Sequence, residues 1–264
     1  MPRVTARDNP RLVEAARLIA SSRDRRKRGK CVLEGDHLVE VYLDRVGVPE
    51  TLLVVEERMH DPRVAALVAR MPSRDVLSMR APLFAETVVA PADVAIAAVV
   101  PTPAHAIPAP ARRHLLLEDI QDPGNVGTML RTAAAAGVDQ VLLSRHCAFA
   151  WSPKVLRAGQ GAHFAVTIVE DVDLPAWCAD FAAGGGQVVA TTPRDARPIY
   201  EAAMSEPWAV AIGNEGAGLS AALLACAPLR IAIPMHAGTE SLNAGAAAAV
   251  VLFELVRRRN AVKA

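Results

Sequence analysis

Apolar residues recur along this chain with two spacings, and the spacing changes many times between the two ends. In residues 10–20 they lie three or four positions apart, which is typical of a helix with one buried face, whereas residues 51–55 form a short, mostly apolar run typical of a buried strand. In the first hundred residues we predict helices at 10–20, 35–46 and 61–70, strands at 31–34, 51–55, 76–77 and 94–100, and a helix or turn at 81–90. This alternation predicts a small α/β domain.

The alternation resumes after a proline-rich segment. Four prolines lie within the ten residues 101–110, which predicts a semi-extended spacer, so we place a domain boundary there, between residues 1–105 and residues 112–264. In the second half we predict strands at 114–120, 138–144, 166–170, 187–191, 207–212 and 231–234, and helices at 126–136, 152–161, 174–183, shortly after 220 and from 241 onward. Strand, loop and helix in this order predict a mostly parallel sheet covered on both faces.

Two of the predicted helices begin at polar residues. Ser241 is the predicted N-cap of the last helix, and residues 245–249 that follow have minimal side chains. So bare a helix is either an alanine-rich core helix or the continuation of a ligand loop, packed closely against another segment. Asn125 is the predicted N-cap of the helix at 126–136, which Gly137 ends.

Arg131 lies in that helix, four residues after Gly127 and off the buried stripe. Helical side chains lean toward the N-terminus, so we expect Arg131 to project over the bare glycine toward the loop at Asn125. The alternative is a solvated surface arginine. The missing side chain at Gly127 favours a functional role.

The composition is that of a globular protein and restricts the possible functions. Of 264 residues, 52% are hydrophobic and 22% are charged, and the net charge is +1, so attraction to nucleic acid has to come from local patches. The four cysteines are far apart without a CxxC pair, which argues against a zinc site or a disulfide framework and fits a reducing, cytoplasmic location. The cysteine spacing therefore leads us to expect no bound metal. No segment has the length and apolar character of a membrane span or a secretory signal, so we expect no membrane partner.

The densest charge lies at residues 21–30, where six basic side chains accompany one acid, Asp24. The basic residues are Arg23, Arg25, Arg26, Lys27, Arg28 and Lys30. A solvated loop and a segment that contacts RNA phosphates are about equally consistent with this run.

A glycine-rich loop with Gly213, Gly216 and Gly218 lies late in the chain. A nicotinamide-binding fold has its glycine fingerprint directly after the first strand, so this loop is weak support for a dinucleotide oxidoreductase. The chain has no Walker A lysine, no HExxH and no GxSxG motif. Glu215 within the loop is either a general base or the cap of a turn, and its spacing does not decide between them.

Three stretches change this interpretation when they are taken together. They are Leu117–Gly137, with Asp122-Pro-Gly-Asn-Val-Gly127 and Arg131; Ala211–Ser220, with Gly213-Asn-Glu-Gly216; and Ile233–Asn243, with Glu240-Ser-Leu-Asn243. In order and separation they resemble the three motifs of the SpoU (TrmH-type) RNA 2'-O-ribose methyltransferases, which belong to the SPOUT class. The resemblance covers about residues 114–260. Residues 20–100 resemble, less specifically, the small L30e/L7Ae-like RNA-binding α/β domain often fused ahead of this catalytic domain.

The resemblance implies a C-terminal domain with a trefoil knot, S-adenosylmethionine as the cofactor and a homodimer with the site at its interface. It implies that Arg131 acts on the attacking ribose 2'-hydroxyl. A guanidinium normally stays protonated, which favours charge stabilisation over proton removal. The matching polar positions, expected to orient Arg131 and the ribose, are Asn125, Glu215, Ser241 and Asn243. The positions that match cofactor contacts are Gly213, Ile233 and Leu242, with Thr191 and Met235 as further candidates.

RNA is the implied partner, and the additional N-terminal domain favours ribosomal RNA over transfer RNA by analogy. A catalytically silent RNA-binding or ribosome-associated protein on the same fold is the alternative. The intact Asn125, Arg131, Glu215 and Asn243 argue against it. The sequence names neither the target nucleotide nor a role for His236.

Overall fold

The computed structural model describes residues 1–264 apart from 89–92, 104–110, 237–240 and 264. Contacts divide the chain into two compact units. Unit 1 comprises Met1–Ala104 together with Trp151–Phe164, and unit 2 comprises the remainder.

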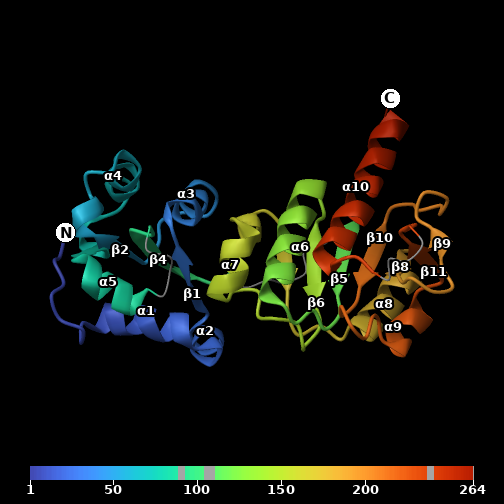
Figure 1. The fold of residues 1–264 in the computed structure, drawn as a ribbon, viewed down its shortest axis with the longest axis horizontal. Helices are drawn as coiled ribbons and strands as arrows, with labels where there is room; N and C mark the ends of the chain where they lie inside the picture. Colours follow the sequence, from blue (N-terminus) through green and yellow to red (C-terminus); the bar gives the residue numbers. More distant parts are fainter. Residues whose placement is uncertain (89–92, 104–110, 237–240, 264) are drawn as a thin grey trace. The chain divides into compact units, whose positions relative to one another are not determined.

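In its described residues, unit 1 has a four-stranded sheet of mixed direction (Figure 1). The strand order is β1 (Lys30–Glu34), β4 (Ile96–Pro101), β2 (Thr51–Val55) and β3 (Val76–Met79). β4 runs antiparallel to both of its neighbours, whereas β2 and β3 are parallel. β2 and β3 are joined by a crossover through a helix, which parallel neighbours require.

The helices of unit 1 surround this sheet. They are α1 (Pro10–Ala20), α2 (Ser22–Arg28), α3 (Asp36–Arg45), α4 (Pro62–Ala69), α5 (Ala81–Thr87) and α7 (Pro153–Gly159), with 3₁₀ turns η1 (Glu56–Arg58), η2 (Ser73–Asp75) and η3 (Ala162–Phe164). The helix predicted at 152–161 therefore exists as α7 but belongs to unit 1, where Phe164 packs edge-on against Tyr42 at 5.3 Å. Arg157 of α7 pairs with the buried Glu34 of β1.

The described residues of unit 2 form a seven-stranded sheet in which every recorded pairing is parallel, as the alternation of strands and helices predicts. The order is β7 (Thr167–Val169), β6 (Gln140–Leu143), β5 (Arg113–Leu117), β10 (Trp208–Ile212), β8 (Gln187–Thr191), β11 (Leu229–Ala232) and β9 (Arg197–Pro198). Its helices are α6 (Pro123–Ala136), α8 (Leu174–Ala183), α9 (Ala221–Cys226) and α10 (Ala244–Lys263). α8 and α9 close one core against side chains of β5, β6, β8 and β10, and α6 lies beside α10 (Figure 1).

Two predicted helix starts are wrong, and in both cases another polar residue is the cap. α6 begins at Pro123, because the Asp122 carboxylate accepts the amide hydrogen of Asn125 at 2.8 Å and proline fits the first helical position. α10 begins at Ala244, and the Asn243 side chain accepts the amide hydrogens of Gly245 at 2.9 Å and Ala246 at 3.2 Å. Asn125 and Ser241 are therefore not N-caps, whereas Gly137 ends α6 in the left-handed conformation as predicted.

The bare start of α10 is needed for close packing. A Cβ atom on Gly245 would lie 3.3 Å from Thr128 Cγ2 and 3.6 Å from Asn125 Oδ1, both in α6. Ala248, one turn farther along, is fully buried. The predicted close packing of this helix against another segment is confirmed, whereas its continuation from a ligand loop stays a prediction.

Candidate active site

The polar motif residues of unit 2 lie in the segments that follow β5, β10 and β11. Parallel strands end at one edge of a sheet, so the loops after Leu117, Ile212 and Ala232 meet there. Ligands of open parallel α/β sheets bind at this carboxyl edge. The edge is the candidate active site.

A chain of side-chain hydrogen bonds joins the three motifs at this edge. Asn125 donates from Nδ2 to Glu215 Oε1 at 2.6 Å, and Asn243 donates from Nδ2 to Asn125 Oδ1 at 2.9 Å. The two partners of Asn125 are 90 and 118 residues away along the chain. Both ends of the Asn125 amide are occupied, so its orientation is fixed.

Asn243 has a second task, which sequence reasoning did not assign to it. Its Oδ1 caps α10 while its Nδ2 reaches Asn125, so one side chain fixes the helix start and the contact to α6. Ser241 lies two residues earlier with an exposed side chain and makes no hydrogen bond to the described residues. It belongs to the same loop, but the structure does not bring it into the Asn125 cluster.

Arg131 is exposed on α6 and makes no hydrogen bond or ion pair with any residue that the structure describes. It lies one turn after the buried Gly127 and after Thr128, which packs near Gly245. A guanidinium carries its charge at all relevant pH values. Arg131 thus presents a positive charge without a partner among the described residues, six positions along α6 from Asn125.

The loop at 213–220 is folded tightly back on itself. A Cβ atom on Gly213 would lie 2.3 Å from the carbonyl carbon of Gly218, so only glycine fits. The Asn214 Oδ1 accepts the amide hydrogens of Gly216 at 2.9 Å and Ala217 at 3.0 Å. These bonds turn the backbone so that Glu215 meets Asn125.

The positions that match cofactor contacts lie around the same edge. Thr191 ends β8 and donates from Oγ1 to the carbonyl of Ala211 at 2.8 Å, so its hydroxyl serves the neighbouring strand. Ile233 is half-buried, whereas Met235 and Leu242 are 37% and 40% exposed. Met235 and Leu242 are thus large apolar side chains that remain open to solvent in the segment that follows β11. His236 is also exposed.

Residues that sequence reasoning missed lie next to those it identified. Asn214 holds the glycine loop, and its Nδ2 donates to the carbonyl of Asp119 at 2.9 Å. Asp119 itself has a left-handed backbone with φ of 56°, a conformation that is rare outside glycine. Polar residues directly after the buried β5 are a recognisable signal, because that strand ends at the ligand edge.

Residues 22–28 of the basic segment form helix α2, so the alternative of a solvated loop is wrong. Arg25 is only 6% exposed and donates to the carbonyls of Leu18 and Ile19, and burial lowers the pKa of its guanidinium. The prediction that Arg25 contacts phosphate is therefore wrong, because its side chain points into unit 1. The exposed residues of the set are Arg23, Arg26, Lys27 and Arg28, with Lys30 half-buried.

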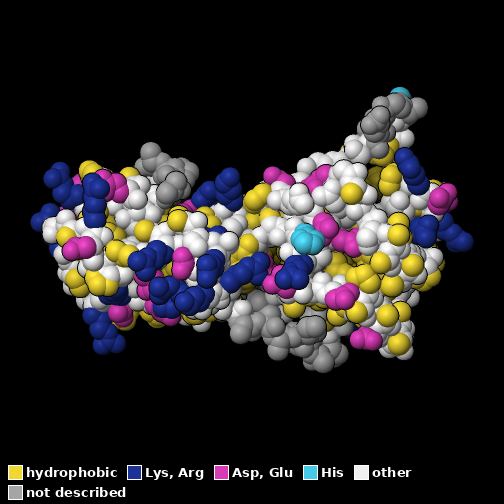
Figure 2. Space-filling model, turned by 90° about the horizontal axis from the view of Figure 1, so that it is seen from below, with side chains coloured by type: hydrophobic (Ala, Val, Ile, Leu, Met, Phe, Trp, Pro, Cys, Tyr) yellow, Lys and Arg dark blue, Asp and Glu magenta, His cyan; other side chains and the backbone are white. Residues whose placement is uncertain are grey.

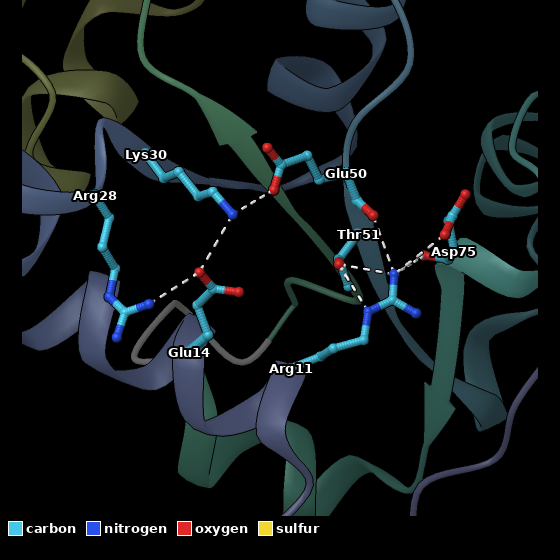
Figure 3. A network of polar contacts seen from close by, with 7 residues as sticks. All are labelled: Arg11, Glu14, Arg28, Lys30, Glu50, Thr51 and Asp75. Atoms are coloured by element: carbon cyan, nitrogen blue, oxygen red, sulfur yellow. Dashed lines mark hydrogen bonds and ion pairs between the residues drawn. The ribbon is translucent and has the colours of Figure 1, made fainter.

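Acidic partners hold the end of this segment in place (Figure 3). Glu14 of α1 pairs with Arg28 at 3.4 Å and with Lys30 at 3.3 Å, and Lys30 also reaches Glu50 at 2.6 Å. The hydrogen bond to Glu50 raises the pKa of Lys30. Figure 2 shows lysine and arginine side chains gathered on the face of unit 1 that bears α1 and α2. Glu14 and Glu50 thus fix Arg28 and Lys30 in place within a surface that is rich in basic side chains.

Two classes of feature are not found in the described residues. No helix there is long and apolar enough to cross a membrane. No group of three or more histidine, cysteine, aspartate or glutamate side chains there has the arrangement of a metal site.

Comparisons with known proteins agree with the geometry. The model of the SpoU rRNA Methylase family matches residues 112–253. The chain is 38% identical over 236 residues to the 23S rRNA (guanosine(2553)-2'-O)-methyltransferase RlmP of Bacillus subtilis, covering 89% of this chain and 92% of that protein.

Two solved structures are similar over nearly the whole chain. One is the SpoU methyltransferase AviRb from Streptomyces viridochromogenes in complex with the cofactor AdoMet, with a TM-score of 0.84 and 26% identity, covering 95% of this chain and 98% of that one. The other is an RNA 2'-O ribose methyltransferase, with a TM-score of 0.81 and 29% identity, covering 97% and 99%.

Proposed function

The chain belongs to the SpoU rRNA methylase family, and we propose that it transfers a methyl group from S-adenosylmethionine to a ribose 2'-hydroxyl of ribosomal RNA. The observation that carries this proposal is the hydrogen-bonded cluster of Asn125, Glu215 and Asn243, which unites the three motifs, with an exposed Arg131 on the same helix as Asn125. The name of the Bacillus relative supports 23S ribosomal RNA as the substrate class.

S-adenosylmethionine supplies an electrophilic methyl group on a sulfonium. We assign its binding to backbone groups at Gly213, Ile233 and Leu242, with Thr191 and Met235 at the border of the pocket. The tight Gly213 turn and the exposed Met235 and Leu242 side chains support this assignment. So does the similarity to an AdoMet-bound structure.

In this proposal Arg131 stabilises the negative charge that develops on the 2'-oxygen as its proton leaves. A fixed cation near a developing alkoxide is a strong catalytic device, because it needs no rearrangement during the reaction. Asn125, Glu215, Asn243 and the hydroxyl of Ser241 orient Arg131 and the ribose. The amides of Asn125 and Asn243 suit that role, since they hold direction without carrying a charge of their own.

We assign residues 112–264 to a SPOUT methyltransferase domain with a trefoil knot. The sheet order supports threading: after β10 the chain passes beyond β8 to β11, and α10 then returns to pack on α6. The small side chains at the start of α10 allow Gly245 to approach Thr128 of α6 closely, which supports a threaded segment.

We assign residues 1–105 to an L30e/L7Ae-like domain that binds the RNA substrate. The four-stranded mixed sheet with flanking helices and the basic side chains on α2 support this. Arg23, Arg26, Lys27, Arg28 and Lys30 are the proposed phosphate contacts.

A homodimer is the proposed assembly, and α10 supplies the argument. Ala246 and Phe253 lie seven positions apart on its exposed side, and Phe253 is 49% exposed. A large apolar side chain at helical spacing on an open face suits contact with a second copy. The proposed substrate places the protein in the cytoplasm, where ribosomal RNA is found.

The test is methyl transfer with purified components. The protein is incubated with methyl-labelled S-adenosylmethionine and with ribosomal or transfer RNA from cells that lack its gene. We expect label in ribosomal RNA. Label in transfer RNA alone would change the substrate, and cofactor binding without transfer to either RNA would favour a catalytically silent RNA-binding protein.

A further inference from the structure

Glu118 is the first residue after β5, and none of the roles assigned above includes it. It is 8% exposed. Its amide donates to the carbonyl of Ile212 at 2.9 Å. Its carboxylate accepts the Ser220 amide hydrogen at Oε2 and the Ser220 hydroxyl hydrogen at Oε1, both at 2.7 Å. One residue therefore contacts the chain immediately before and at the end of the loop 213–220.

The two ends of this loop touch each other, so a movement of one end is transmitted to the other. The space beside Gly213 is filled by the backbone of Gly218 and Leu219, and Gly218 donates its amide hydrogen to the Asn214 carbonyl at 2.9 Å. Leu219 packs into the core under α8 and α9. A shift at Ser220 thus displaces the backbone around Gly213.

Asn214, near the start of the loop, is held by the residue that follows Glu118. The Asp119 carbonyl accepts a hydrogen bond from Asn214 Nδ2. Ser144 holds Asp119, because its Oγ accepts the Asp119 amide hydrogen at 2.9 Å and donates to the Asp119 carboxylate at 2.6 Å. Glu118 and Asp119 therefore act on different parts of the loop.

A simpler role for the Glu118–Ser220 contact would be to cap α9. That cap is already present, since the Ser220 hydroxyl oxygen accepts the Leu223 amide hydrogen at 3.2 Å. A buried carboxylate costs free energy unless its hydrogen bonds are strong, and both of these are charge-assisted. The carboxylate is needed for the position of the loop, not for the helix start.

We propose that Glu118 is a positioning residue for methyl transfer: it holds the loop 213–220 in the shape that binds S-adenosylmethionine and presents Glu215 to Asn125. This rests on the proposed function. Glu118 does not touch the reacting atoms. It acts through Ser220 and the loop backbone.

The experiment measures the dissociation constant for S-adenosylmethionine by calorimetry, well below the melting temperature of each protein. The variants are Glu118→Ala, Glu118→Gln and Ser220→Ala. Ser152→Ala is the matched control, because Ser152 also caps a helix, accepting from Val155, but has no carboxylate partner among the described residues. Melting temperatures are measured in parallel.

We expect Glu118→Ala to raise the dissociation constant about tenfold or more, the size of one or two lost charge-assisted hydrogen bonds. Glu118→Gln should stay within about threefold of the wild type, because glutamine accepts from the Ser220 amide and donates to its hydroxyl. Ser220→Ala should weaken binding by about threefold or more, whereas Ser152→Ala should leave it unchanged.

Unchanged cofactor affinity in Glu118→Ala, with only the melting temperature lowered, would overturn the proposal and leave Glu118 a structural residue. If Glu118→Ala does not fold, Ser220→Ala decides: an affinity equal to that of Ser152→Ala contradicts the positioning role. A wild-type protein that fails to bind S-adenosylmethionine would instead overturn the proposed function.

Discussion

On unit 1 the polar side chains of Figure 3 pair as charges across the surface, whereas at the carboxyl edge of unit 2 Asn125 and Asn243 pair as neutral amides. The ionic pairs are spread over several side chains, such as Glu14 with both Arg28 and Lys30. Asn125 instead has one specific partner at each end of its amide, the Glu215 carboxylate and the Asn243 amide. The ion pairs of unit 1 keep charged side chains at a surface, whereas the hydrogen bonds of Asn125 hold its amide in one orientation.

The difference has an energetic basis. Exposed ion pairs contribute about 0–1 kcal/mol each and are screened by salt, so single changes on unit 1 affect stability little. A positive surface still attracts phosphates over a distance. Hydrogen bonds of a fixed amide depend on geometry, so a small change at the edge of unit 2 is expected to reduce the reaction rate steeply. Changes on unit 1 therefore test the attraction of RNA phosphates, and changes at the edge of unit 2 test the positioning of the reacting groups.

Arg131→Ala should have the largest effect. We expect the rate of methyl transfer to fall by about 10²–10³-fold, because the charge that stabilises the developing alkoxide is lost. Cofactor affinity should stay near that of the wild type. Single-turnover transfer and calorimetry measure the two quantities. Arg145→Ala, which removes another exposed arginine of unit 2, is the control, and a near wild-type rate in Arg131→Ala would refute the assignment.

Asn243→Asp separates the two tasks of this side chain. Aspartate caps a helix as well as asparagine does, so the melting temperature should not change. It has no hydrogen to donate to Asn125 Oδ1, and we expect the transfer rate to fall about tenfold to a hundredfold. Asn243→Ala should lose the same activity and, in addition, about 1 kcal/mol of stability. An Asn243→Asp enzyme with full activity would show that the amide donor is unimportant.

Replacing Arg23 and Lys27 with glutamine tests attraction on unit 1. Both are exposed and outside the Glu14 network. We expect weaker RNA binding, with the slope of log affinity against log salt reduced by about 1.5 for two lost phosphate contacts. The maximal transfer rate should not change. Arg63→Gln, which removes an exposed charge elsewhere on unit 1, is the control, and an unchanged slope in the double variant would contradict the proposed RNA surface.

The smallest effect is a difference in pH dependence between the units. Burial lowers the pKa of His114 in unit 2, where it packs on Trp177 and Phe181. Its folded-state pKa lies below the unfolded value of about 6.5, so its contribution is complete above that pH and is lost as the pH falls. Burial raises the pKa of Glu34 in unit 1, so its contribution is complete below about pH 4.3 and is lost as the pH rises.

Urea unfolding of wild type, His114→Gln and Glu34→Gln between pH 4 and pH 7, followed by tryptophan fluorescence, measures these slopes. The stability of the wild type relative to His114→Gln should decrease toward acid, and its stability relative to Glu34→Gln should decrease toward neutral pH. Slopes of the same sign would show that burial does not control both groups.

Much of the fold follows from local pattern. The helix at 10–20 and the strand at 51–55 are found where their spacing predicts them, because period and flanking residues agree. Gly137 ends α6 because only glycine adopts the left-handed conformation without strain. The two residues of β9 are too few to show any period.

Features that depend on tertiary contacts were not predictable. Short buried strands look alike in sequence whether they pair in parallel or antiparallel. The sequence therefore did not show that β4 runs antiparallel to β1 and β2. The burial of Arg25 depends on how α2 turns against α1, which a run of basic residues does not reveal. Segment 151–164 joins unit 1 through the contact of Phe164 with Tyr42, far apart in the chain.

Part of the candidate site was predictable from the sequence and part was not. The motif residues Asn125, Glu215 and Asn243 were named from the sequence, and the structure brings them together. The cap of α6 is Asp122 and not Asn125, because aspartate and asparagine cap helices about equally well and residue type alone does not identify the cap. The place of Glu118 directly after β5 marked it as a residue of the ligand edge, but its partner could not be predicted, because Ser220 is 102 residues away.

The most direct test of the central claim is the position of the transferred methyl group. Ribosomal RNA from cells lacking the gene is incubated with S-adenosylmethionine and either the wild-type protein or Arg131→Ala, and each linkage is tested for resistance to alkaline cleavage, which a 2'-O-methyl group confers. The account predicts one newly resistant linkage with the wild type and none with Arg131→Ala. Methyl transfer to a base, without any resistant linkage, would contradict it.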